Sequence, residues 1–264
     1  MAKPIILWEN ELEWASEISC LTSEPDYPVE NLKDWREYLV WKSDSAGTHT
    51  IDITLSTHYF LPREKIRAFA LYNYSHSAES TPVALEVRYS SDQVNWTEWF
   101  FDENDLVSGE PYIYLDPTGV PYPNIYWQVI FYSQEPSPIV AQVGLMFLGD
   151  YLEFPCYPES GFDPNSEEVI LEPTRSERGY LLGVVEKYRQ RKLSVEFPFL
   201  SDSWVRDNFL PFWNNHIPKP FLFAWDYENH SDELYLVEIA EPRLELPYNP
   251  ICRSLRLEIT GRKL

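Results

Sequence analysis

Alternation of apolar and polar residues is the feature that most limits the fold of this chain. In THTIDITL (residues 48–55), Ile and Leu fall at every second position and Asp and Thr stand between them. ALEVRYSS (84–91) repeats the pattern with Leu, Val and Tyr against Glu and Arg. Side chains of a strand point alternately to the two faces of its sheet. Each segment therefore predicts a half-buried β-strand rather than a helix.

Three further segments are apolar on both faces: 65–74 (KIRAFALYNY), 125–132 (IYWQVIFY) and 139–149 (IVAQVGLMFLG). Such segments are typical of strands that are covered on both sides. The chain has 22 prolines and 9 glycines, which favours many stiff connections between short strands over long helices. We therefore predict a mainly β fold whose first domain is a jelly-roll β-sandwich.

The pattern changes after residue 150. Residues 151–168 hold three prolines and show no sustained period, which predicts a domain boundary. We expect a β-sandwich at 1–155, a linker at 156–168 and a smaller α+β, barrel-like domain with one flanking helix at 169–264. In that second domain, strands are predicted at 219–226, 233–239 and 254–261.

Two local predictions concern the second domain. GYLLGVVEKY (179–188) and LSVEFPF (193–199) are predicted to form a hairpin that turns at residues 189–191. Ser201 or Asp202 is predicted to cap a helix in which Val205 and Phe209 begin an apolar stripe. Pro211 is expected to kink or divide this helix, because proline lacks the amide hydrogen that a helix interior needs.

Charge excludes one class of function. The formal net charge is −21, from 42 acidic and 21 basic residues. Proteins that bind nucleic acid do so through Lys and Arg that displace counterions from the phosphates, so specific nucleic-acid binding is not expected. An acidic wall would still let DNA pass without adhering, and passive contact with DNA in a channel stays open.

Motifs for catalysis and for metal binding are missing from the sequence. It contains no GxSxG, GxxxxGK, GxGxxG or HExxH pattern, and its three cysteines form no CxxC pair. We expect no enzymatic activity, no cofactor and no metal centre, and we interpret the five histidines as surface or turn residues. The N-terminal apolar run PIILW is too short for a signal peptide and no segment is long enough to cross a membrane. We therefore expect the protein to be synthesised in the cytoplasm of a host cell.

Aromatic residues in loops are the one ambiguous signal. They stand in PDYP (25–28), NYSHSAES (73–80) and VPYPNIYW (120–127), which we expect to project from strand ends. Their rings could stack on the faces of sugars, anchor a protein interface, or only cover the bases of the loops. The candidate binding residues are Tyr27, Asn73, Tyr74, His76 and Tyr122.

The N-terminal part resembles discoidin-type, galactose-binding-like jelly rolls. The resemblance covers residues 18–150 and depends on YPVENLKDW (27–35), the Trp41-Lys42-Ser43 triplet, IDITL (51–55) and EVRYSSDQVNWTEW (86–99), in which Gln93 stands where the family has a turn glycine. It implies that Trp41 fills the core and that Trp96 closes the turn after Asp92. It also implies that any ligand binds at loops at one end, which would be 25–28 and 73–80.

The C-terminal part is similar in pattern to tail-tip proteins of tailed bacteriophages. The similarity includes Arg178 and Gly179, and the segments 191–197, 204–213, 219–226 and 253–261. It implies a structural virion protein of a tail tip or baseplate, present in the virion tail, which forms a homo-oligomeric ring and docks other tail proteins. Here the sandwich precedes the ring-forming unit, so the type of tail protein stays open. The alternative is a carbohydrate-binding module that recognises surface glycans through its loop aromatics.

Overall fold

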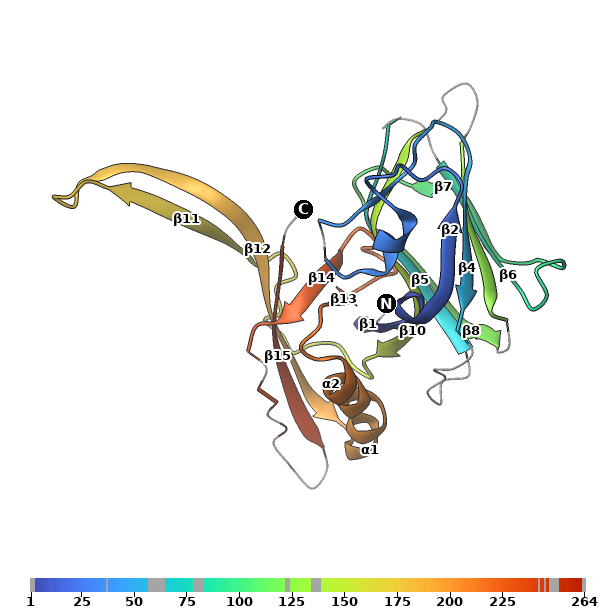
Figure 1. The fold of residues 1–264 in the computed structure, drawn as a ribbon. Coiled ribbons are helices and arrows are strands. Elements are labelled where there is room, and N and C mark those ends of the chain that lie inside the picture. The colour runs from blue at the N-terminus through green and yellow to red at the C-terminus, as the bar shows by residue number, and fades with distance from the viewer. Residues whose placement is uncertain are drawn as a thin grey trace. The chain divides into compact units, whose positions relative to one another are not determined.

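The computed structural model describes residues 3–36, 38–56, 65–77, 83–121, 124–133, 139–241, 243–244, 246 and 252–262. The chain is mainly β, with one helical segment after residue 201 (Figure 1). It divides into two compact units. The sandwich unit is Leu7–Tyr151 with Tyr227–Leu234, and the C-terminal unit is Met1–Ile6, Leu152–Asp226 and Tyr235–Leu264. Strand β1 (Ile5–Asn10) contributes residues to both units.

The sandwich unit contains two layers of antiparallel strands (Figure 1). One layer is a five-stranded sheet in the order β2 (Ala15–Cys20), β4 (His49–Leu55), β9 (Tyr126–Tyr132), β6 (Val83–Ser90) and β7 (Thr97–Leu106). The other layer places β5 (Lys65–His76) between β10 (Ala141–Glu153) and β8 (Tyr112–Pro121), with β3 (Trp41–Lys42) on β10. Two short 3-10 helices, η1 (Glu11–Trp14) and η2 (Val29–Lys33), lie in the N-terminal part.

The core of this unit lies between the two layers, and it confirms the alternation predicted for β4. Ile51 and Ile53 are buried, while Asp52 between them is exposed. Trp41 is fully buried and its Nε1 donates to Ser23 Oγ at 2.9 Å. The role implied for Trp41 as a core-filling residue is therefore confirmed.

The C-terminal unit has the strand order β11 (Glu167–Arg175), β12 (Leu181–Leu200), β15 (Arg253–Arg262), β14 (Leu234–Ile239) and β13 (Phe221–Ala224). The core of this unit is rich in stacked aromatic rings. The rings of Phe154 and Phe197 lie 3.9 Å apart and 4° from parallel, and both are fully buried. Phe212 and Phe221 meet edge to face at 5.1 Å.

The helical segment is built from α1 (Asp202–Trp204), a π-helical turn η3 (Val205–Phe209) and α2 (Leu210–His216). The cap prediction is confirmed: Ser201 Oγ accepts from the amide of Trp204 at 3.2 Å. Phe209 is fully buried, as its place in the apolar stripe predicted. Pro211 stands at the start of α2, where its missing amide hydrogen breaks no bond of the α-helix. The helix changes from π to α geometry just before Pro211, and its backbone stays helical across the change.

The predicted hairpin turn at residues 189–191 is wrong. These residues lie inside β12, and the true hairpin pairs β11 with β12 across a turn at residues 176–180. Gly179 in that turn has a φ of 81°, a conformation that glycine adopts readily. Arg-Gln-Arg offers no residue suited to a tight turn.

The segment predicted as a linker, 156–168, is also different in the structure. Residues 152–166 group with the C-terminal unit. The amide of Glu159 donates to the carbonyl of Glu196 at 2.7 Å, and the amide of Lys192 donates to the carbonyl of Ser166 at 3.3 Å. Proline content correctly indicated a lack of regular structure there, but these backbone bonds hold the segment against β12.

Candidate functional site

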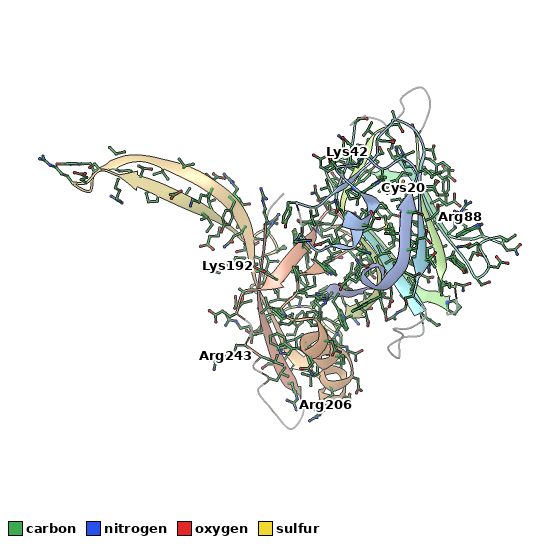
Figure 2. All side chains as sticks on the ribbon, viewed as in Figure 1. Cys20, Lys42, Arg88, Lys192, Arg206 and Arg243 are labelled. Carbon is green, nitrogen blue, oxygen red and sulfur yellow. The ribbon has the colours of Figure 1, made fainter. Side chains whose placement is uncertain are left out.

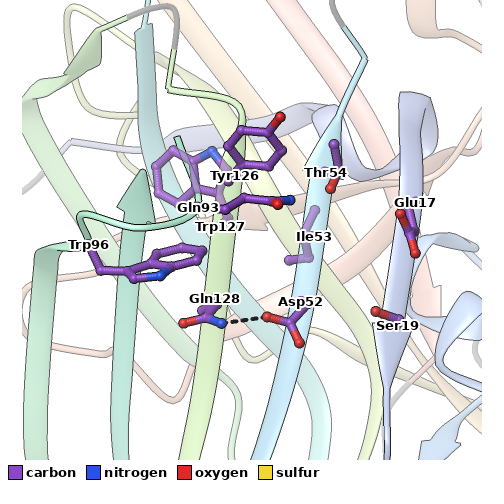
Figure 3. Close-up of a pocket in the computed structure, with 10 residues that line it drawn as sticks. All are labelled: Glu17, Ser19, Asp52, Ile53, Thr54, Gln93, Trp96, Tyr126, Trp127 and Gln128. Atoms are coloured by element: carbon purple, nitrogen blue, oxygen red, sulfur yellow. Dashed lines mark hydrogen bonds between the residues drawn. The ribbon is translucent and has the colours of Figure 1, made fainter. Parts of the chain in front are cut away.

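A hollow of about 340 Å³ lies on the sandwich unit, over strands β2, β4 and β9 of the five-stranded sheet (Figure 3). Its lining combines carboxylates, hydroxyls, amides and aromatic rings. The lining residues are Glu17, Ser19, Asp52, Ile53, Thr54, Gln93, Trp96, Tyr126, Trp127 and Gln128.

Strand periodicity explains why polar side chains gather here. Asp52 and Thr54 are the outward residues of β4, whose inward partners fill the core. Register places Asp52 opposite Gln128 of β9 and opposite Ser19 of β2. Residues that are far apart in the sequence therefore form one row across three neighbouring strands, a width of about 10 Å at the usual strand spacing.

A chain of hydrogen bonds fixes the amide of Gln128. Its Nε2 donates to Asp52 Oδ1 at 2.5 Å, and its Oε1 accepts from Arg88 Nε at 2.6 Å. Arg88 Nη1 also lies 3.9 Å from Glu86 Oε1, and Glu86 Oε2 accepts a hydrogen bond from the hydroxyl of Tyr132. The hydrogen bond to Glu86 is the main cause of a raised pKa for Tyr132, and burial of the hydroxyl is the second cause. The network holds Asp52 and Gln128 in one arrangement before any ligand binds.

The turn between β6 and β7 positions Trp96 at the rim of the hollow. Asp92 Oδ1 accepts from the amides of Val94 and Asn95 at 2.9 and 2.8 Å. These bonds to Asn95 and Val94 hold the pKa of Asp92 well below its usual range. Gln93 has a φ of 63°, so it adopts the left-handed conformation for which the family resemblance expects glycine.

Trp96 is half-buried, and the side chain of Arg88 lies against its ring. The guanidinium carbon of Arg88 lies 5.4 Å from the centre of the Trp96 ring, within the range of a cation–π contact. Figure 3 shows the rings of Trp96 and Tyr126 beside Gln93, with Asp52 and Gln128 joined by their hydrogen bond. One side of the hollow is therefore aromatic and the opposite side, towards Glu17 and Asp52, is acidic.

The charge of the hollow limits its ligands. Glu17 and Asp52 are acidic and none of the ten lining residues is basic. A phosphate, sulfate or carboxylate group would face repulsion without a compensating cation. The neutral hydroxyl and amide groups of Ser19, Thr54 and Gln128 can donate and accept hydrogen bonds. The arrangement suits an uncharged or cationic molecule that carries several hydroxyl groups.

The residues predicted as binding residues do not form this site. Asn73, Tyr74 and His76 lie in β5 of the opposite layer, not in a projecting loop. Tyr74 is fully buried and stacks on Phe131, with ring centres 5.9 Å apart, and His76 is buried beside it. The prediction of a loop from residue 73 is wrong because the alternation of β5 continues through these residues. Their rings face the core.

The other two predicted residues have different outcomes. Tyr27 is exposed in a turn, and its ring lies 5.6 Å from Lys42 Nζ, which pairs with Glu24 at 3.0 Å. Tyr27 does not line the hollow. Tyr122 lies outside the described residues. None of the four predicted residues that the structure describes, Tyr27, Asn73, Tyr74 and His76, therefore lines the hollow.

Histidine and cysteine show no metal chemistry in the part of the chain that is described. No group of three or more His, Cys, Asp and Glu side chains is arranged to hold a metal ion there, and all three cysteines are free. The interpretation of the histidines as surface or turn residues is wrong for His49, His76 and His216, which are buried in β4, β5 and α2. His49 is held by Thr22 and by the Ile139 carbonyl, and burial lowers its pKa. No described helix is long and apolar enough to cross a membrane.

Comparison with known proteins finds no matching family model and no matching curated protein. Solved structures of similar fold include a Clostridium perfringens CBM32 in complex with GalNAc-β-1,3-galactose (13% identity, TM-score 0.42), covering 55% of this chain and 99% of that one. The family 32 CBM of C. perfringens NanJ in complex with galactose matches at 10% identity and a TM-score of 0.39, covering 56% of this chain and 99% of that one. A chitosan-binding module from a Paenibacillus chitosanase/glucanase matches at 12% identity and a TM-score of 0.39. That match covers 54% of this chain and 100% of the module.

Proposed function

We propose that the sandwich unit binds a carbohydrate in the hollow on its five-stranded sheet. The observation that carries this proposal is the combination of an aromatic rim with a row of fixed polar groups in one cavity of about 340 Å³. Sugars present an apolar face of C–H groups and an edge of hydroxyls. An indole stacks against the first, and carboxylate or amide groups bind the second.

The free hydrogen-bonding capacity of the site supports a hydroxyl-rich ligand. Asp52 uses Oδ1 for Gln128 and directs its second oxygen to no protein donor among the described residues. A carboxylate oxygen that accepts from a sugar hydroxyl forms a charge-assisted hydrogen bond, which is stronger than a neutral one. With Glu17 also in the lining, an amino sugar would gain further attraction over a neutral one. We infer that neutral sugars and amino sugars bind, and that sulfated or uronic sugars do not.

Titration of the protein with neutral and amino oligosaccharides, monitored by tryptophan fluorescence and by calorimetry, tests the proposal. Trp96→Ala removes the stacking surface and is expected to weaken binding by about tenfold or more, equivalent to at least roughly 1.4 kcal/mol. Asp52→Asn keeps the shape and removes the charge, and is expected to weaken amino sugars more than neutral ones.

Tyr38→Ala is the matched control, because Tyr38 is an exposed aromatic residue of the same unit outside the hollow. It should bind like the parent protein. The proposal is wrong if Trp96→Ala and Tyr38→Ala bind every sugar equally well, or if the parent protein binds none.

A second candidate function is a structural, self-associating part of a phage tail tip or baseplate. One observation favours it: the hairpin of β11 and β12 exposes many large apolar side chains. Location in a virion, ring formation and docking of other tail proteins all depend on this candidate and stay predictions. Absence of catalysis is likewise a proposal under either function, and incubation with bound oligosaccharides, followed by an assay for new reducing ends, tests it.

A further inference from the structure

The hairpin of residues 167–192, which we call the arm, has no core of its own. It comprises β11, the turn at 176–180 and the first part of β12, and Figure 1 shows it extending beyond β15 as a two-stranded ribbon. Eight of the seventeen large apolar residues found exposed in the described chain lie within these 26 residues. They are Val169, Leu171, Tyr180, Leu181, Leu182, Val184, Val185 and Tyr188. Figure 2 draws the side chains along this ribbon, with Lys192 labelled where the arm ends.

Exposure on this scale is costly for an isolated ribbon. A two-stranded hairpin is marginally stable in water, and large exposed apolar patches mark interaction surfaces. Leu182 and Val185, which lie three residues apart on β12, are 67% and 62% exposed. The arm therefore has the character of a surface that is covered in an assembled state.

The backbone of the arm also has unpaired edges. In the described residues, β11 pairs only with β12, and β12 gains its second neighbour, β15, only from Gln190 onward. The outer edge of β11 contains Pro173, which has no amide hydrogen and so weakens that edge as a pairing site. Residues 181–189 of β12 contain no proline. The open edge best suited to accept another strand is therefore this stretch of β12.

Charge indicates what kind of partner fits. The arm holds six of the 21 basic residues but only five of the 42 acidic ones. The remaining residues hold 15 basic and 37 acidic side chains. Two copies of this chain repel each other over most of their surfaces, since both are strongly negative. The arm has one more basic than acidic residue, so an acidic second copy would attract it rather than repel it.

The charges within the arm are largely paired with each other. Arg189 bonds Glu167 at 3.0 Å and Glu186 at 2.8 Å, and Lys187 lies 2.9 Å from Glu172. These pairs remove local repulsion but leave the apolar side chains between them uncovered. A partner can therefore contact the apolar surface without burying an unpaired charge.

We propose that the arm is a self-association element: residues 181–189 of β12 pair edge to edge with a strand of a second copy of this chain, and that copy covers the exposed apolar side chains. This inference does not depend on sugar binding in the hollow. It supplies a physical basis for the second candidate function, and it would hold for a self-associating protein outside a virion as well.

Sedimentation of the full chain across a concentration series tests the proposal. The parent protein is expected to show a mass that rises above the 31.2 kDa of one chain. Leu182→Lys combined with Val185→Lys replaces exposed side chains, so folding should be preserved. Lysine on an edge strand opposes strand pairing, and we expect the association constant to fall by at least about tenfold, equivalent to 1.4 kcal/mol.

Leu21→Lys combined with Val94→Lys is the matched control, because it makes the same change of charge at two exposed apolar residues outside the arm. It should associate at least as strongly as the parent, and a loss equal to that of the arm variant overturns the proposal. A parent protein that stays monomeric throughout the series also overturns the proposal. The same holds if the arm binds a different protein but no second copy of this chain.

Hydrogen exchange gives a second measurement that does not depend on substitutions. Amides of residues 181–189 that point to the open edge should exchange more slowly as the protein concentration rises, because a second copy would accept hydrogen bonds from them or cover them. Association without any added protection in this stretch contradicts the proposal. Sugar titrations on the arm variant separate the two proposals, since its binding in the hollow should be unchanged.

Discussion

Strands β10 and β12 have similar apolar content but opposite environments. Nearly every residue of β10 is buried, whereas residues 181–189 of β12 are all exposed. Both segments contain valine and aromatic residues, which favour strands, and both are strands. The difference lies in what covers them: β10 lies between β5 and β3 in a two-layer sandwich, while the arm is a ribbon on its own. Apolar content thus predicts a strand, but the neighbouring layer decides whether its side chains are buried.

The sharpest test of this difference uses the two ends of β12. Phe197 is fully buried against Phe154, in the half of the strand that is covered. Phe197→Ala is expected to destabilise the C-terminal unit by about 3–5 kcal/mol, the usual cost of removing a buried phenylalanine. Urea denaturation measures this loss. A loss below about 1 kcal/mol would show that the side chain of Phe197 is exposed, like those of the arm.

Glycines provide a matched pair on the two strands. A Cβ added to Gly149 of β10 would lie 2.1 Å from the carbonyl oxygen of Glu9, so the backbone would have to move. Gly149→Ala is expected to destabilise the sandwich unit by roughly 1–3 kcal/mol, as overpacking does. Gly183→Ala in the arm meets nothing within 4 Å. It should be neutral or slightly stabilising, and an equal loss at both sites by thermal denaturation would refute the contrast.

Replacement of Asp92, in the turn between β6 and β7, is expected to lower stability by a smaller amount that depends on pH. The folded pKa of Asp92 lies below its unfolded value, so its contribution is fully present above about pH 4, the unfolded pKa of aspartate. It is lost as the pH falls towards the folded pKa. Asp92→Ala should therefore be less stable than the parent protein at pH 7. The gap in melting temperature should narrow below pH 4, and a constant gap from pH 7 to pH 3 would contradict this account.

The smallest effect is expected in the arm. Val185→Ala shortens a side chain that is 62% exposed, and in dilute solution the free energy of unfolding should change by less than about 0.5 kcal/mol. The same substitution should cost more at concentrations where copies associate. Equal effects at low and high concentration would show that this side chain remains uncovered.

Local features of the fold were predictable where the sequence itself contains the cause. Alternation in IDITL gave the burial of Ile51 and Ile53, and Ser201 gave the helix cap. The turn at Gln93 kept the left-handed geometry expected there, because Asp92 supplies the hydrogen bonds that stabilise the turn. Burial of Tyr74 and His76 was also present in the sequence, since both continue the alternation of β5.

The hollow was not predictable, because it depends on strand order and register. Ser19, Asp52 and Gln128 come from three segments, and only the pairing of β2 and β9 with β4 brings them together. Polar residues at outward positions occur on every half-buried strand, so none of them stands out in the sequence. The exposure of the arm was hidden for a similar reason: its apolar run reads like that of a covered strand.

The discontinuity of the C-terminal unit has a consequence during synthesis. Residues up to Ile6 leave the ribosome before the sandwich unit, but they group with segments that are made only after residue 151. Most of the sandwich can fold early as a nascent domain, whereas residues up to Ile6 wait for partners that are made after residue 151. A chain stalled near residue 151 would therefore carry a nearly finished sandwich while Pro4, Ile5 and Ile6 still lack their partners in the C-terminal unit.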